Sequence, residues 1–269
     1  MFPAERIVCL TEETVETLYL LGEDRRIVGV SGYAVRPPRV RREKPRVAAF
    51  ISADVDKILA LEPDLVLTFS DLQADIVATL IRRNVAVHAF NQRDVAGILD
   101  MIRTLGALTG AAEAADALAR SLTEKLAVVR GSSATGRRPR VYFEEWDDPM
   151  ITGIRWVAEL VETAGGVDVF PELSRRKNAK DRIVSARDVI AAEPDIIVGS
   201  WCGKKFVPAK VAARDGFADV PAVRTGWLRE IKSALILQPG PAALTDGLDA
   251  LVAIIDEWRR NRSQARTSR

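Results

Sequence analysis

Four aromatic residues stand where a flat ligand could stack on them, each beside an apolar run typical of a buried strand. They are Phe69, Trp146, Trp201 and Trp227. In open α/β sheets, ligands bind beyond the carboxyl ends of the strands, and large planar ligands favour aromatic walls. We therefore expect these rings to converge on one ligand-binding site. The alternative is that each ring fills the contact between two lobes of the protein.

Basic residues accompany the aromatic ones in three stretches. The first lies within residues 36–46 and begins with Arg36, the second lies within residues 175–182, and the third is Lys204-Lys205. If they face the site, they suit an anionic ligand, such as a carboxylate chelate, a ferric siderophore or a phosphate-bearing corrinoid. The alternative for most of them is an ordinary solvated charged loop.

An acidic run from Glu144 to Asp148 follows a strand and could supply acid–base catalysis or bind a metal ion. It supports the competing hypothesis of an enzyme or a regulatory protein. Against an enzyme, the sequence shows no nucleophile–base pair and no phosphate-loop motif. The single histidine, His88, excludes a three-histidine zinc site. Cys9 and Cys202 are too few for an iron–sulfur cluster, and a disulfide between them stays open.

Composition and charge restrict the classes of partner. The chain has 269 residues, with 39 basic and 37 acidic side chains and a net charge of +2. That balance gives no reason to expect nucleic acid, and no apolar run is long enough to span a membrane. No export signal precedes the first strand, so the protein is expected in the cytoplasm as written, or in the periplasm if a signal was removed. We expect a monomer without an intrinsic cofactor.

An internal repeat organises the chain. Residues 54–67 read DVDKILALEPDLVL, and residues 185–198 read SARDVIAAEPDIIV. Each copy predicts a short helix that ends before proline, followed by a strand that is apolar on both faces and belongs in a buried parallel sheet. A further pair of matching strands is predicted at residues 85–87 and 222–223. Because strands alternate with helices, each half predicts an α/β unit with a parallel sheet.

Residues 94–130 separate the two halves and have apolar residues at helical spacing. Gly106 and Gly110 are the points where this helix could kink or divide. The predicted architecture is therefore α/β, with two Rossmann-like lobes, residues 1–93 and 131–269, joined by a long bridging helix. A rigid helical connector limits hinge motion, so we expect a cleft that closes little on binding.

The order and duplication of these elements resemble the helix-bridged (class III) periplasmic substrate-binding proteins of cobalamin and ferric-siderophore ABC importers. The resemblance is greatest to the vitamin B12-binding members and covers roughly residues 6–256. It rests on loops at residues 10–16, 28–38, 47–52, 66–70 and 142–146. It implies a non-catalytic receptor for a cobalamin-like or ferric-siderophore-like chelate, with an ABC permease as a further partner.

The resemblance also implies roles for particular residues. Four of them match aromatic positions that line the ligand cleft of the family: Tyr33, Phe50, Phe69 and Trp146. The family docks on its permease through an acidic residue on each lobe, and Asp56 matches the first of these. At the second position the chain has Arg187, with Asp188 next to it. This displaced charge and the missing export signal leave a cytoplasmic relative as an alternative to the importer receptor.

Overall fold

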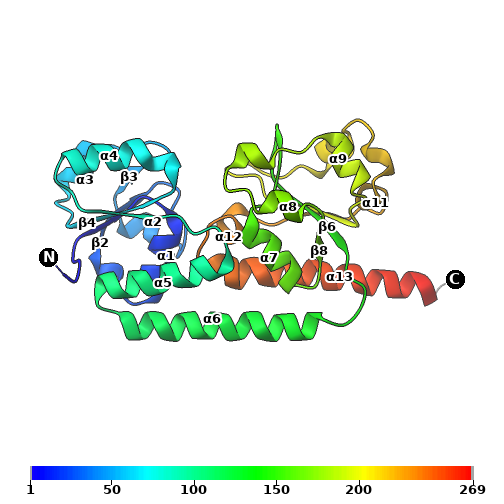
Figure 1. The fold of residues 1–269 in the computed structure, drawn as a ribbon, viewed down its shortest axis with the longest axis horizontal. Helices are drawn as coiled ribbons and strands as arrows, with labels where there is room; N and C mark the ends of the chain where they lie inside the picture. Colours follow the sequence, from blue (N-terminus) through cyan, green and yellow to red (C-terminus); the bar gives the residue numbers. More distant parts are fainter. Residues whose placement is uncertain (1, 268–269) are drawn as a thin grey trace. The chain divides into compact units, whose positions relative to one another are not determined.

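A computed structural model describes residues 2–267 and resolves two compact units (Figure 1). Unit 1 comprises Met1–Gln92 and Ala96–Leu122, and unit 2 comprises Arg93–Val95 and Thr123–Arg269. The first residue and the last two residues of the lobes expected from the sequence lie outside the described residues. Both units are α/β, as predicted.

Unit 1 is built on a five-stranded sheet in which every pairing is parallel. In spatial order its strands are β3 (Arg46–Ala48), β2 (Ile27–Ser31), β1 (Ile7–Cys9), β4 (Leu65–Phe69) and β5 (Val87–Phe90). The central strands β1 and β4 are buried along their whole length, because their side chains are apolar on both faces. Since all five strands run the same way, their carboxyl ends share one edge, named edge 1.

Helices cover both faces of this sheet (Figure 1). They are α1 (Glu12–Leu20), α2 (Val40–Glu43), α3 (Val55–Ala60), α4 (Ala74–Arg82) and α5 (Val95–Thr109). The first half of α6 (Ala112–Ser133) lies along α5, on its side away from the sheet. Ile58 of α3 and Leu80 of α4 pack with Val8 and Val66 of the central strands in one core cluster. Asp54 caps α3, because its carboxylate accepts a hydrogen bond of 3.1 Å from the Lys57 amide.

The segment predicted as a bridging helix is helical but divided at one of the two glycines named from the sequence. Gly110 has a φ of +76°, a left-handed conformation that ends α5 and lets α6 turn back. Gly106 lies where the two helices approach each other, since a Cβ there would come within 2.2 Å of the Ala115 Cβ. The division between units 1 and 2 falls within α6.

Unit 2 has a mixed sheet, which corrects the prediction of a parallel one. In spatial order its main strands are β10 (Leu228–Glu230), β9 (Ile196–Gly199), β6 (Arg140–Asp147) and β7 (Met150–Thr152), and β8 (Val167–Asp168) also pairs with β6. β8 and β9 run parallel to β6, but β7 is antiparallel. The reason is that β6 turns back on itself through Asp148-Pro149, and a two-residue connection can only join antiparallel strands.

A second prediction, the strand at residues 222–223, was wrong. Ala222 and Val223 lie in a short helix, α11 (Pro221–Arg224), rather than in a strand. Pro221 stands at the first helical turn, where its fixed φ and missing N–H favour a helix start. The matching strand is β10, which the chain enters only after Gly226 with a φ of +71°. Trp227 therefore precedes β10 and lies at its amino end.

The other helices of unit 2 repeat the pattern of unit 1. They are α7 (Arg155–Thr163), α8 (Pro171–Ser174), α9 (Ala186–Ala191), α10 (Pro208–Ala212), α12 (Ser233–Ile236) and α13 (Leu248–Thr267). α9 and β9 follow each other as α3 and β4 do, which confirms the helix–strand repeat. The start of α9 is a capping box, in which the Ser185 side chain and the Asp188 carboxylate each bond the other's backbone amide.

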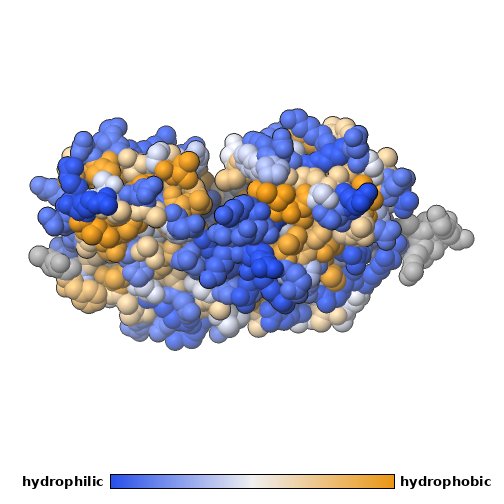
Figure 2. Space-filling view, turned by 45° about the horizontal axis from the view of Figure 1, so that its top comes forward, coloured by the Kyte–Doolittle hydropathy of each residue, from blue (hydrophilic) through white to orange (hydrophobic). Residues whose placement is uncertain are grey.

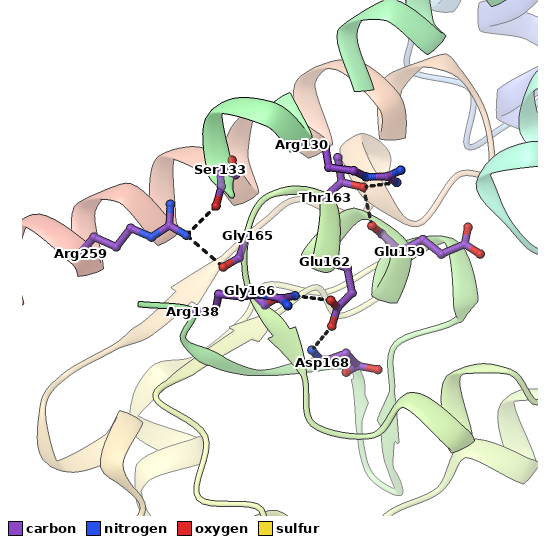
Figure 3. A network of polar contacts seen from close by, with 10 residues as sticks. All are labelled: Arg130, Ser133, Arg138, Glu159, Glu162, Thr163, Gly165, Gly166, Asp168 and Arg259. Atoms are coloured by element: carbon purple, nitrogen blue, oxygen red, sulfur yellow. Dashed lines mark hydrogen bonds and ion pairs between the residues drawn. The ribbon is translucent and has the colours of Figure 1, made fainter. Parts of the chain in front are cut away.

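Arginine side chains hold the ends of helices together in unit 2 (Figure 3). The Arg259 guanidinium of α13 donates to the Ser133 carbonyl at the end of α6 (3.2 Å) and to the Gly165 carbonyl just after α7 (3.1 Å). Arg138 donates to the Gly166 carbonyl at 3.1 Å. Because helix carboxyl ends carry unpaired carbonyls and partial negative charge, cations are favourable there. These contacts fix the starts of β6 and β8.

One acid of unit 1 is buried without a cation. Glu13, in the first turn of α1, is 1% exposed and accepts a hydrogen bond of 2.7 Å from the Thr11 hydroxyl. Burial raises the pKa of this carboxyl from 4.5 to about 8, and the neighbouring Glu12 adds to the rise. Glu13 is thus protonated in the folded protein at neutral pH. In unit 2, burial likewise raises the pKa of Asp168 from 3.8 to about 6.

Gly106→Ala is expected to destabilise the protein by about 1–3 kcal/mol, because the new methyl group must push α5 and α6 apart. Gly131→Ala, in the same pair of helices, meets no atom within 4 Å and should stabilise α6 by up to about 1 kcal/mol. Chemical denaturation of both variants measures the difference. Equal stability of the two would show that the helices do not pack closely at Gly106.

Glu13→Gln is expected to remove a pH dependence of stability between pH 4.5 and 8. The folded carboxyl titrates above the unfolded one, so its stabilisation is complete below pH 4.5 and is lost as the pH rises to about 8. The variant should therefore be more stable than the wild type at pH 8, with little difference at pH 4. Denaturation across this range tests it. Asp168→Asn serves as the matched case, with an effect confined to pH 3.8 to about 6.

Candidate functional site

Edge 1 presents aromatic and aliphatic side chains to solvent. Tyr33 follows β2 and is 53% exposed, and Phe50 follows β3 and is half-buried. Ile51, 70% exposed, and Leu72, 58% exposed, belong to the loops after β3 and β4. Figure 2 shows apolar residues reaching the surface among hydrophilic ones on the face that it presents. Edge 1 is thus an apolar surface with two rings available for contact.

Phe69 has a different environment from the other two predicted rings of unit 1. It ends β4, lies opposite Phe90 of β5 and is only 6% exposed. The structure therefore places it at edge 1, as predicted, but within the packed layer beneath the surface. Sequence alone could not separate it from Tyr33 and Phe50, because burial depends on the neighbouring strand.

Gln73 holds the loops of edge 1 together, and sequence reasoning missed it. This fully buried side chain accepts a 2.9 Å hydrogen bond from the Phe69 amide and donates to the carbonyls of Phe50 (2.7 Å) and Leu10 (3.3 Å). One amide thus ties together the segments after β1, β3 and β4. The signal for it was the turn after β4, where Ser70 caps the short 3₁₀ helix Asp71–Gln73.

The basic run at residues 36–46 divides into anchored and exposed side chains. The Arg36 guanidinium donates to the Glu16 carboxylate at 2.8 Å and fixes the loop after β2 to α1. Arg39 lies 4.7 Å from the Tyr19 ring, and Lys44 donates to the Asp24 carbonyl at 2.7 Å. These three contacts are local supports of unit 1. Arg41, Arg42 and Arg46 are exposed, and so is Arg39 despite its contact with Tyr19.

In unit 2 a buried carboxylate organises the carboxyl ends of β6 and β9. Glu144 is fully buried and accepts two hydrogen bonds from the Arg214 guanidinium, at 2.6 and 2.9 Å. It also accepts from the Trp201 indole at 2.9 Å and the Tyr142 hydroxyl at 3.0 Å. Burial and the Glu144 charge together raise the pKa of Tyr142 well above its usual value. Both oxygens of the Glu144 carboxylate thus accept hydrogen bonds from side chains of unit 2.

The other acids of the predicted run are also engaged. Glu145 forms a two-pronged ion pair with the buried Arg182, at 2.6 and 3.2 Å. Asp147 pairs with Lys204, and the Asp148 carbonyl accepts the Trp146 indole hydrogen at 2.8 Å. Among the described residues, no three His, Cys, Asp or Glu side chains lie close enough to hold a metal ion. Three acids of the run, Glu144, Glu145 and Asp147, are therefore held in ion pairs, while the Asp148 side chain is exposed.

Trp146 and Trp201 both lie at the carboxyl edge of the unit 2 sheet, as predicted. Trp146 is half-buried, and the Lys204 ammonium lies 3.9 Å from its ring centroid, a cation–π contact. Trp201 is 3% exposed and packs edge-on against Phe206, with ring centroids 5.0 Å apart. Gly199 permits this packing, since a Cβ there would come within 1.9 Å of the Phe206 ring. The Trp146 ring is the more accessible of the two.

A hollow of about 450 Å³ opens beside Trp201. It is lined by Trp201 and residues 203–205, after β9, and by residues 230–234, at the end of β10 and beyond it. Lys204, Lys205 and Lys232 belong to this lining. Its size is within the range of small-molecule sites, and its position at the carboxyl ends of parallel strands is where such sites form in α/β sheets.

Trp227 does not belong to this edge, which corrects the prediction that it stands at a carboxyl strand end. It precedes β10, is 8% exposed, and its ring lies 4.4 Å from the Arg229 guanidinium. The prediction failed because it assigned the strand to residues 222–223, before Trp227, whereas β10 begins after Trp227. The two cysteines are not joined by a disulfide: Cys9 is buried in unit 1, and Cys202 is exposed in unit 2.

The two acids expected to dock on a permease lie on the matching helices of the repeat, one residue out of step. Asp56 lies in the first turn of α3, is exposed, and has its carboxylate 3.4 Å from the Arg83 guanidinium. Asp188 lies in the first turn of α9 and is also exposed. Hydrogen bonds from Ser185 lower the pKa of the Asp188 carboxyl, so it stays charged. The negative charge of the second copy has moved by one residue and is retained on the same helix.

Sequence comparison finds relatives whose names describe cobalamin or vitamin B12 binding. A cobalamin-binding protein of Halobacterium salinarum is 24% identical over 244 residues, which cover 88% of this chain. The match spans 66% of that relative's length, slightly less than two thirds. A vitamin B12-binding protein of Vibrio cholerae is 27% identical over 202 residues, covering 74% of this chain and 71% of the relative.

Solved structures share the fold. The periplasmic vitamin B12 binding protein BtuF of Vibrio cholerae superposes with a TM-score of 0.76 at 23% identity, covering 95% of this chain and 98% of that one. The periplasmic heme-binding protein RhuT of Roseiflexus sp. RS-1 gives a TM-score of 0.79 at 23% identity, covering 94% and 99%. No helix within residues 2–267 combines the length and apolarity needed to cross a bilayer.

The sheets, the helix–strand repeat and the apolar strand ends agree with these likenesses. The model of the periplasmic binding protein family matches residues 7–235, which is most of the chain. The chain therefore belongs to the periplasmic binding protein family.

Proposed function

We propose that this protein is the solute receptor of an ABC importer and binds a cobalamin-like or iron-containing chelate. The observation that carries the proposal is the exposed apolar surface of edge 1, where Tyr33 and Phe50 present rings at the carboxyl ends of parallel strands. Flat macrocycles such as corrinoids and haem have large apolar faces that stack on such rings. The names of the relatives, which bind cobalamin, vitamin B12 or haem, support the same class of ligand.

We infer that the protein binds its ligand without catalysing a reaction. The acidic run was the strongest candidate for acid–base chemistry, and three of its four acids are held in ion pairs. Glu144 is held by Arg214 and Glu145 by Arg182, at distances of 2.6 Å in both pairs. A carboxylate whose oxygens already accept hydrogen bonds from an arginine is not free to contact a substrate. This pairing supports a receptor over an enzyme that reuses the fold.

We further propose that Asp56 and Asp188 dock the loaded receptor on its permease. Both are exposed in the first turn of equivalent helices, α3 and α9, and so offer one negative charge on each unit. Arginine side chains of a membrane partner would recognise such charges. In this role the protein acts as a monomer outside the cytoplasmic membrane; a cytoplasmic relative of the importer receptors is the alternative. Residues 94–130 would then connect the lobes formed by residues 1–93 and 131–269.

Titration with hydroxocobalamin and with ferric haem, followed by quenching of tryptophan fluorescence, is expected to give saturable binding to the wild type. Tyr33→Ala and Phe50→Ala should each weaken binding by about 1–3 kcal/mol, because each removes an aromatic surface that the ligand covers. Leu20→Ala is the control, since Leu20 is 54% exposed on unit 1 but ends α1 far from edge 1. Its affinity should equal that of the wild type.

Two results would contradict the proposal. If neither chelate binds, the protein is not a receptor for this class of ligand. If chelates bind and all three variants keep the wild-type affinity, edge 1 is not the contact surface. Loss of absorbance of the bound chelate with time, through its conversion, would instead favour the enzyme.

A further inference from the structure

The hollow beside Trp201 has a charge that the proposed apolar contacts do not explain. It lies in unit 2 between the loops after β9 and β10, and it has a volume of about 450 Å³. Three of its lining side chains are ammonium groups, those of Lys204, Lys205 and Lys232, and one is a carboxylate, that of Glu230. The lining therefore has an excess of positive charge.

The three lysines differ in what they contact. Lys204 pairs with Asp147 and lies over the Trp146 ring at 3.9 Å. Lys232 forms an ion pair of 2.7 Å with Glu230. For Lys205, within the described part of the chain, the ammonium has no ion pair or hydrogen bond, and the side chain is exposed. Lys205 thus differs from the other two lysines in forming no described ion pair or hydrogen bond, although its charge acts on the nearby Glu230 carboxylate.

Glu230 stays ionised and offsets one of the three positive charges, so the lining keeps an excess of positive charge. Burial would raise its pKa, but hydrogen bonds from Lys232 and from the Phe206 amide (3.2 Å), with the charge of Lys205, lower it overall. Its Oε1 atom accepts both of those bonds, so Glu230 is committed to structural partners. It holds Lys232 beside Lys205 and fixes the Phe206 loop. Two ammonium groups held at one opening suit a ligand with an anionic group.

Resting on the receptor function proposed above, we propose that this hollow binds a carboxylate or phosphate group of the ligand, with Lys205 and Lys232 as its contacts. Trp201 forms the wall beside that group. The ligand class narrows accordingly to anionic chelates, with an apolar face and at least one acidic arm. An ion pair at a partly enclosed opening is stronger than one on an open surface, because less water screens it.

Citrate and inorganic phosphate test the anion site directly, at constant ionic strength and by titration calorimetry. The wild type should bind citrate, and Lys205→Gln combined with Lys232→Gln should weaken binding about tenfold or more, through the loss of two charge-assisted contacts. Lys210→Gln is the matched control, because Lys210 is an exposed lysine on α10 outside the hollow. Its affinity should not change. Circular dichroism confirms that all variants fold.

The absence of saturable binding of either anion up to about 10 mM would overturn the anion site. Equal weakening by the Lys210 control would also overturn it, since binding would then reflect net charge alone. The anion site would likewise be overturned if the double variant bound citrate as tightly as the wild type does.

Haem and its dimethyl ester separate this inference from the receptor function. Haem has two carboxylates and the ester has none, while their apolar faces are alike. If the double variant weakens binding of haem but not of its ester, the hollow recognises the acidic arm of the chelate. If both compounds bind wild type and variant equally well, the receptor function stands and the role of the hollow in recognition fails. If neither compound nor hydroxocobalamin binds, the receptor function fails, and the citrate titration still decides the anion site.

Discussion

The parallel direction of the central strands is the constraint on which the candidate site depends. A parallel sheet brings the loops after all its strands to one edge, whatever their separation in the sequence. In unit 1 this places Tyr33 and Phe50 on the same edge as Gln73, which bonds three of the loops. In unit 2 it brings Trp201 and Lys232 to one hollow. Helical connections between the strands set this direction and cover both faces of the sheet, so the central strands of unit 1 are apolar on both sides.

In unit 2 a buried charge, the Glu144 carboxylate, organises the carboxyl edge of the sheet. A buried carboxylate is costly unless hydrogen bonds replace the water it has lost. Glu144 meets that requirement with an arginine, an indole and a phenol. The same bonds fix the Trp201 ring beside the hollow, so the network positions a wall of the candidate site. This explains why an acid at a strand end, a frequent place for catalytic groups, has a structural role here.

Each unit thus offers a different kind of contact. Edge 1 is apolar, with two accessible rings, and the hollow of unit 2 is cationic. Contact with edge 1 would contribute affinity through buried apolar area, and contact with the hollow would contribute discrimination among anions. Asp188, the displaced acid, lies at the start of α9 and is not among the residues that line the hollow, so its negative charge does not belong to the cationic lining.

The sequence by itself determined the α/β class, the helix–strand repeat, the apolar central strands and two candidate glycines for dividing the 94–130 helix, of which the structure uses Gly110. These features depend on local periodicity and on residues with restricted or unusual backbone geometry, such as Gly110. Only the tertiary structure decided that Phe69 is covered, that Glu144 is neutralised by Arg214 and that Gln73 joins three loops, since those partners are distant in the sequence. It also moved Trp227 to the amino end of β10, because Pro221 starts a helix where an apolar pair had indicated a strand.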